Sequence, residues 1–122
     1  DLLVGNAELF FHLFDLLRAF VSIDVNSGKF TGKKKAEETY RKINLEAAAE
    51  IARQIRLRNL SGIILVDFIN MESQERNERL LDELRHLAHN DRILTTIVDM
   101  TPLGLVEITR KKTKKALKEQ IN

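Results

Sequence analysis

The chain has 122 residues, which fits a single domain, and 43% of them are hydrophobic, which excludes a disordered polymer. The 20 basic and 18 acidic side chains leave a net charge of only +2, so the composition excludes a histone-like polycation. With no cysteine there is no disulfide framework, thiolate metal site or cysteine nucleophile, and a reducing compartment fits this composition.

The first part of the chain predicts a helix followed by a strand. Residues 1–18 carry apolar side chains at near-helical spacing, with Asn6 as a candidate cap, and this pattern predicts an N-terminal helix. Residues 19–25 (AFVSIDV) are rich in apolar and β-branched side chains, which is typical of a strand. The Asn-Ser-Gly sequence at 26–28 then ends that strand.

The middle of the chain predicts a strand–helix–strand unit. Residues 63–68 (IILVDF) form an almost wholly apolar run, which is typical of a strand buried on both faces. Two strands joined by a helix predict a parallel, right-handed βαβ unit. The helix covers residues 36–58, where apolar side chains recur every three or four positions along one face: Tyr40, Ile43, Ala47, Ile51 and Ile55.

The last third predicts a helix and a β-hairpin. Residues 73–90 are amphipathic, and residues 93–99 and 104–109 have β patterns with a Thr-Pro pair between them, which predicts a hairpin. Residues 110–122 form a basic tail that we expect to be helical. Together the elements predict one α/β domain over residues 1–122: a βαβ unit plus a helix and a β-hairpin, in a mixed sheet of about four strands with helices packed on it.

Acidic side chains stand near the carboxyl ends of both strands of the predicted βαβ unit. Asp24 closes the first strand and Asp67 lies near the end of the second. Ligands of parallel α/β sheets bind beyond these strand ends. One or two carboxylates suffice for Mg²⁺, which keeps several of its waters. In the alternative interpretation, each aspartate only closes its strand by accepting backbone hydrogen bonds.

Two asparagines also stand out. Asn26, two residues after Asp24, would share its face of the strand and donate a hydrogen bond to a bound phosphate, or else serve only as a turn residue. Asn44 lies in the middle of the predicted long helix despite its weak helix propensity. We favour a structural role for Asn44, either as a buried hydrogen-bonding partner of the sheet or at the surface.

Basic residues gather after the first strand, at the end of the long helix and in the C-terminal tail. Such runs suit phosphate backbones through counterion release, and they are also common as solvated surface. The residues concerned are Lys29, Lys33, Lys34, Lys35, Arg53, Arg56, Arg58, Arg110, Lys111, Lys112, Lys114, Lys115 and Lys118.

Three motifs follow one another within residues 23–71: IDVNSG, NLEAAAEIARQIRLR and GIILVDFINM. In their order and spacing they resemble the catalytic core of the ribonuclease E/G family. The similarity continues through NDRI (90–93) and GLVEITRKK (104–112), and it covers roughly residues 21–113. Several separated motifs agree, so the resemblance is specific.

The resemblance implies a bacterial, cytoplasmic endoribonuclease that hydrolyses single-stranded RNA with Mg²⁺ and leaves 5′-phosphate and 3′-hydroxyl ends. The metal-binding aspartates of the family match Asp24 and Asp67, and the family asparagine near the scissile phosphate matches Asn26. The matched stretch corresponds to the deoxyribonuclease-I-like part of the core. We expect its RNA-backbone contacts to come from Lys29, Lys33, Lys34, Arg110 and Lys112.

The chain also departs from the family. Residues 1–20, the atypical helical segment, replace the Ser-Gly-Gly strand that usually leads into the first aspartate, and Asn70 stands where many members have Asp. The S1 domain, the pocket that senses the RNA 5′ end, the ribonuclease-H-like part and the zinc-sharing cysteines have no counterpart in this sequence. We therefore interpret the chain as a fragment or truncated relative.

Three hypotheses follow. The first is a Mg²⁺-dependent endoribonuclease catalytic subdomain, and the second is a module that binds RNA or phosphate without cleaving it. The third is a structural fragment that forms a homo-oligomer or associates with missing partner domains.

No apolar run reaches about 18 residues, so we expect no membrane-spanning segment, and the N-terminus lacks the basic region of a signal peptide.

Overall fold

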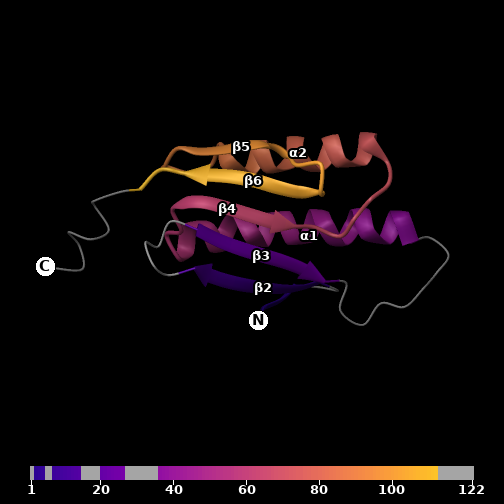
Figure 1. Cartoon of the computed structure of the whole chain (residues 1–122), viewed down its shortest axis with the longest axis horizontal. Coiled ribbons are helices and arrows are strands. Elements are labelled where there is room, and N and C mark those ends of the chain that lie inside the picture. The colour runs from indigo at the N-terminus through magenta and orange to yellow at the C-terminus, as the bar shows by residue number, and fades with distance from the viewer. Residues whose placement is uncertain (1, 5–6, 15–19, 27–35, 113–122) are drawn as a thin grey trace, which may run out of the picture.

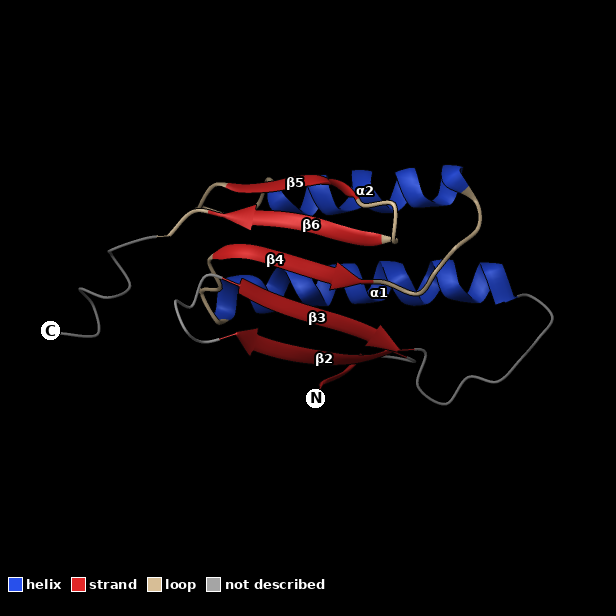
Figure 2. Cartoon of the chain, viewed as in Figure 1, coloured by secondary structure: helices blue, strands red, loops and turns tan. Residues whose placement is uncertain are grey.

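A computed structural model describes residues 2–4, 7–14, 20–26 and 36–112, and confirms the predicted α/β class. The described strands form one sheet in the order β1-β2-β3-β4-β6-β5, and both helices lie on the same face of it (Figures 1 and 2). The strands are β1 (Leu2–Val4), β2 (Ala7–Phe14), β3 (Phe20–Asn26), β4 (Gly62–Asp67), β5 (Thr95–Met100) and β6 (Leu105–Arg110), and the helices are α1 (Ala36–Leu57) and α2 (Gln74–Ala88).

The predicted βαβ unit is confirmed as β3–α1–β4. The two strands are parallel, with Phe20 opposite Ile63 and Asp24 opposite Asp67. The apolar stripe of α1 faces the sheet, because four of its residues are essentially inaccessible to solvent: Ile43, Ala47, Ala48 and Ile51. Burial of this stripe holds the crossover helix against the sheet and thereby fixes the register of the two strands.

The predicted hairpin is also confirmed. Strands β5 and β6 are antiparallel, and β6 pairs with β4 in the antiparallel sense, which makes the sheet mixed. The turn passes through Gly104, whose φ of 86° lies in the region that favours glycine. Helix α2 begins after Ser73, whose hydroxyl accepts a hydrogen bond from the Arg76 N–H as an N-cap.

The predicted N-terminal helix is wrong. Residues 7–14 form β2, which pairs with β3 in the antiparallel sense. Leu9 is fully buried and Phe11 packs against the core, whereas His12 is exposed, so the segment follows the two-residue period of a strand. Apolar residues at neighbouring positions hid this period, and pairing with β3 overrides local propensity. The sheet therefore has five main strands and the three-residue β1 rather than about four strands.

The sheet has one covered and one uncovered face in the part of the chain that the structure describes. Side chains of β4 alternate between Ile64 and Val66, which are fully buried, and Ile63, which is 45% exposed. The prediction that this strand is buried on both faces is therefore wrong, because both helices cover the same side. The same alternation places Asp24 and Asp67 on the uncovered face.

A buried ion pair joins three parts of the fold. Arg110 ends β6 and is only 4% exposed, and its Nε and Nη2 donate to the Asp91 carboxylate at 2.8 and 3.2 Å. Its Nη1 donates to Asn59 Oδ1 and to the Leu60 carbonyl, both at 2.9 Å. One guanidinium therefore ties the end of β6 to the α2–β5 connection and to the α1–β4 turn.

The end of α1 explains why two of these acceptors are available. Asn59 has a φ of 49°, and the Leu60 and Asn59 N–H groups donate to the carbonyls of Ile55 and Arg56 at 3.0 and 3.1 Å. This is a Schellman ending, for which asparagine is the usual alternative to glycine. The turn presents the Asn59 side chain and the Leu60 carbonyl to Arg110.

Removal of the guanidinium should be strongly destabilising. Arg110→Ala should lower the free energy of unfolding by about 3–5 kcal/mol, because it leaves the Asp91 carboxylate buried without its cation. Urea unfolding followed by circular dichroism measures the change. The control is Lys111→Ala at the next, exposed position, where we expect less than about 0.5 kcal/mol. Equal losses in the two variants would contradict the role assigned to Arg110.

The ion pair also predicts an acid limit to stability. Burial by itself raises the pKa of the Asp91 carboxyl, but hydrogen bonds from Arg110, the Ile93 N–H and the Thr95 hydroxyl, with the charge of Arg110, lower it to about 2. Because this pKa lies below that of the unfolded chain, the stabilisation is complete above about pH 4 and is lost as the pH falls through about 2.

We therefore expect the difference in unfolding free energy between the wild type and Asp91→Asn to shrink from about pH 4 to pH 2. Urea titrations at a series of pH values measure this difference. A difference that stays constant over the whole range would show that the carboxylate charge does not stabilise the folded chain.

Candidate active site

The structure places Asp24 and Asp67 side by side. They are register partners on the adjacent parallel strands β3 and β4, and each lies at or near the carboxyl end of its strand. Directly opposite residues share one face of a sheet, so both side chains project from the uncovered face. Asp24 is half-buried and Asp67 is exposed, so the pair is open to a ligand from solvent.

The surroundings of the pair disfavour two negative charges. Partial burial, and next to it the charge of Asp24, raise the pKa of the Asp67 carboxyl above its ordinary value. The register places Phe10 beside Asp24 and Leu105 beside Asp67, so apolar neighbours on both sides limit hydration of the pair. A bound cation would relieve this repulsion.

The donor set fits a hard divalent cation. Among the described residues no group of three or more His, Cys, Asp or Glu side chains gathers around a common point, so a cation at this position would have these two carboxylates as its ligands from the described residues. A pair of carboxylates with the remaining positions left to water is the ligand set that Mg²⁺ accepts. It does not match the closed tetrahedral set of structural zinc.

Asn26 lies on the same face as Asp24, two residues further along β3, and it is exposed. Its register partner on β2 is Glu8. The side-chain amide therefore stands at the carboxyl end of β3, next to the aspartate pair. From there it could donate a hydrogen bond to a phosphate bound at the pair.

The predicted RNA-contacting residues are not brought together in the described part of the chain. Lys29, Lys33 and Lys34 lie outside the described residues. Arg110 is not available for a contact with RNA, because its guanidinium is buried and bound to Asp91. Lys112 is exposed, but it follows the end of β6 that lies opposite Gly62, roughly 17 Å along the strands from the aspartate pair.

A group of arginines outside the predicted RNA contacts lies at the same end of the sheet as the pair, but on the side of the sheet that the helices cover (Figure 1). A surface hollow at the N-terminal ends of α1 and α2 is lined by Arg41, Arg76 and Arg79. These helix ends lie at the same end of the sheet as the carboxyl ends of β3 and β4 (Figure 1). Glutamates pair with these arginines, as in the 3.2 Å contact of Arg41 with Glu38, so the hollow carries both charges. Two of the three arginines follow their glutamate at helical spacing, Arg41 after Glu38 and Arg79 after Glu75, and this pattern in the sequence could have identified them.

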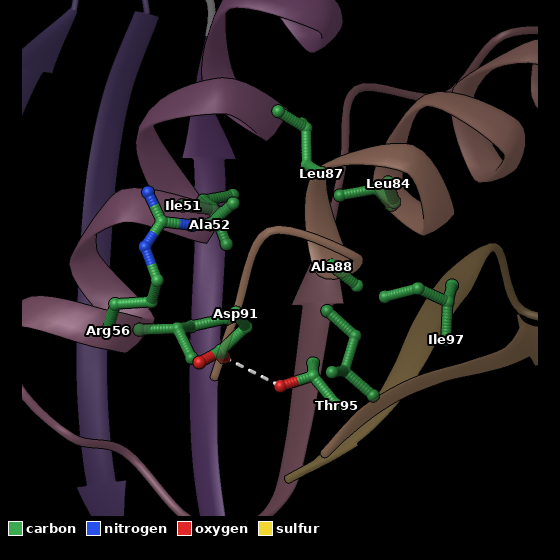
Figure 3. Close-up of a pocket in the computed structure, with 11 residues that line it drawn as sticks. Ile51, Ala52, Arg56, Leu84, Leu87, Ala88, Asp91, Thr95 and Ile97 are labelled. Carbon is green, nitrogen blue, oxygen red and sulfur yellow. Dashed lines mark hydrogen bonds between the residues drawn. The ribbon is translucent and has the colours of Figure 1, made fainter. Parts of the chain in front are cut away.

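A separate apolar pocket lies between α1, α2 and β5 (Figure 3). It is lined by core residues such as Ile51, Leu84 and Ile97, and the Thr95 hydroxyl donates to Asp91 across its edge at 2.7 Å. Its volume of about 20 Å³ has room for about one water. The pocket therefore belongs to the packing of the core and offers no place for a nucleotide.

The fold and the site thus define a small α/β domain with two aspartates side by side on a parallel strand pair. Residues 13–113 match the family model of the Ribonuclease E/G family, and the chain belongs to this family.

In the described part of the chain, no helix combines the length and apolar character that crossing a membrane requires.

Relatives of known name are similar over most of the chain. Ribonuclease G of Salmonella typhimurium (strain SL1344) is 42% identical over 105 residues, which are 86% of this chain and 22% of that protein. Ribonuclease G of Haemophilus influenzae is 44% identical over 99 residues, 81% of this chain and 20% of that protein. The Ribonuclease E/G-like protein of Pyropia yezoensis is 42% identical over 122 residues, 100% of this chain and 23% of that protein. The chain spans about a fifth of the length of these relatives.

Neutralising one aspartate should stabilise the metal-free chain. Because the pKa of Asp67 is raised, its charge destabilises the folded state at neutral pH, so Asp67→Asn should raise the melting temperature there. The gain should vanish once the pH falls below about 4, where the carboxyl is protonated in both states. Calorimetry in the presence of EDTA measures both effects.

The matched control is Asp82→Asn, on the exposed side of α2, where the carboxylate lies 3.6 Å from the Arg85 guanidinium. This change removes an attraction, so it should leave the melting temperature unchanged or slightly lower. A rise of equal size in both variants would point to a general effect of net charge and would contradict repulsion between Asp24 and Asp67.

Proposed function

We propose that the chain is the catalytic subdomain of a Mg²⁺-dependent endoribonuclease that acts on single-stranded RNA in the cytoplasm during RNA processing or decay. The observation that carries the proposal is the register pairing of Asp24 with Asp67 on adjacent parallel strands, in a chain of the Ribonuclease E/G family. The names of its relatives, Ribonuclease G among them, support RNA as the substrate.

In this proposal Asp24 and Asp67 hold the cation through one or more carboxylate oxygens. Mg²⁺, when bound, polarises the phosphoryl group and lowers the pKa of a bound water. Because the Asp24 and Asp67 side chains project from the uncovered face, the reacting phosphate would bind on that face. Asn26 would donate an amide hydrogen to a non-bridging oxygen of this phosphate. Water adds to phosphorus, the bond to the 3′-oxygen breaks and that oxygen takes a proton, which leaves 5′-phosphate and 3′-hydroxyl ends.

A second candidate function is a fragment that binds RNA or phosphate, or associates with itself or with missing partner domains, without cleaving RNA. The uncovered sheet face favours the association, because Ile63 is 45% exposed there. Exposed apolar side chains on one face are typical of a surface that another protein surface covers.

The discriminating experiment is cleavage of a 5′-monophosphorylated single-stranded RNA with and without Mg²⁺. The wild-type chain should cleave only with Mg²⁺, and Asp24→Asn and Asp67→Asn should each slow cleavage by roughly 100-fold or more, since the metal supplies several kcal/mol in the transition state. Asp82→Asn is the matched control and should cleave at the wild-type rate. End-labelled RNA on denaturing gels gives both the rates and the product ends.

Other outcomes contradict the enzyme. Salt-sensitive RNA binding with no Mg²⁺-dependent cleavage would identify a binding module, because phosphate contacts weaken steeply as salt rises. Neither binding nor cleavage, together with a concentration-dependent oligomer in sedimentation, would identify the structural fragment.

A further inference from the structure

Asn44 is a buried polar residue in the interior of α1. Its side chain is inaccessible to solvent, with an exposure of 0%, and it lies on the face of the helix that packs against the rest of the domain. Asparagine is a poor helix former, and burial of an amide is unfavourable unless each of its polar atoms has a partner. We therefore expect both polar atoms of the Asn44 side chain to have hydrogen-bond partners.

Those contacts all go to the backbone of one residue. Asn44 Nδ2 donates to the Ile69 carbonyl at 2.9 Å, and the Ile69 N–H donates to Asn44 Oδ1 at 3.0 Å. Ile69 comes two residues after Asp67, the last residue of β4. The helix thus holds the chain at the point where it leaves the strand, through a pair of bonds resembling those between two strands.

Asp67 is consequently fixed from both sides. Upstream, the sheet holds it in register between Asp24 on β3 and Leu105 on β6. Downstream, Phe68 is buried with an exposure of 5%, and the next residue is the one that Asn44 binds. Without these bonds the last residue of a strand is free to fray, and its carboxylate would no longer stay level with its neighbour.

We propose that Asn44 is a positioning residue that keeps the Asp67 carboxylate beside that of Asp24 for cation binding. This inference rests on the proposed function. Asparagine suits this task because its side chain offers both an acceptor for the Ile69 N–H and a donor for the Ile69 carbonyl. Alanine would leave both backbone groups without partners in the interior. Groups that orient metal ligands typically contribute 10–100-fold to affinity.

A second asparagine provides a matched control. Asn77 of α2 donates from Nδ2 to the Met71 carbonyl at 3.1 Å, so it binds the same connection between β4 and α2. Its contact is one hydrogen bond, four residues beyond Asp67, and not two bonds next to it. Asn77→Ala also removes an asparagine side chain of a helix that binds this connection, but it leaves the contact at the exit from β4 intact.

The test measures binding of Mn²⁺, as a probe for Mg²⁺, to the whole chain by electron paramagnetic resonance. The wild type should bind Mn²⁺ in competition with Mg²⁺, and Asp24→Asn and Asp67→Asn should lose this binding. Asn44→Ala should weaken it by about tenfold or more, whereas Asn77→Ala should change it by less than about threefold. Exchange of the Ile69 amide hydrogen should become at least tenfold faster in Asn44→Ala alone.

Two further variants keep the test independent of folding. Asn44→Asp preserves the size of the side chain and the acceptor for Ile69, so it replaces Asn44→Ala if that variant does not fold; it too should weaken Mn²⁺ binding. Ile55→Val removes a buried methylene at the far end of α1 and lowers the melting temperature, but should leave Mn²⁺ affinity unchanged. Melting curves show that each variant is folded during the titration.

The outcomes are separable. Unchanged Mn²⁺ affinity in folded Asn44 variants, even with faster exchange at Ile69, would overturn the positioning role and leave Asn44 as a structural residue only. Equal weakening by Asn77→Ala or Ile55→Val would overturn it as well. If the wild type binds no Mn²⁺, or if both aspartate variants bind it normally, the proposed function itself fails, and this result does not involve any variant of Asn44.

Discussion

The buried pair of Arg110 and Asp91 is the interaction on which the rest of the fold depends. It closes the end of the sheet opposite to the aspartate pair, and it satisfies the carbonyl and side chain that the end of α1 presents. Charge at this end is neutralised inside the protein, and the pKa of Asp91 is lowered accordingly. At the other end the charges of Asp24 and Asp67 oppose each other. One end of the domain thus supplies stability, and the other carries two like charges whose repulsion a bound cation would reduce.

Helix α1 connects these two ends. Near its C-terminus the turn at Asn59 receives the guanidinium of Arg110, and nearer its N-terminus Asn44 binds the backbone of Ile69. Both contacts act on the ends of β4, because one lies just before the strand and the other just after it. The strand is therefore fixed lengthwise against the helix, while its neighbours β3 and β6 fix it sideways.

Much of this arrangement could be predicted from local sequence. Periodicity located β3, both helices and the hairpin, and the rule for carboxyl ends of parallel strands placed Asp24 near Asp67. The N-terminal strand was missed because apolar residues occupy both of its faces. The burial of Arg110 was missed because its partner is 19 residues away and Asn59 is 51 residues away, so the basic run gave no sign of either. Such contacts follow from tertiary packing and not from the pattern around the residue.

The parallel pairing of β3 with β4 has a consequence for when the site comes into being. The pair that carries the two aspartates is closed only after the whole of α1 has crossed from β3 to β4, and β4 also reaches its other neighbour, β6, over a long stretch of sequence. Contacts of such long sequence separation form late in folding, because the loop-closure entropy must be overcome first. A nascent or partly folded chain would therefore hold Asp24 and Asp67 apart, and the two carboxylates come side by side only when folding of the crossover is complete.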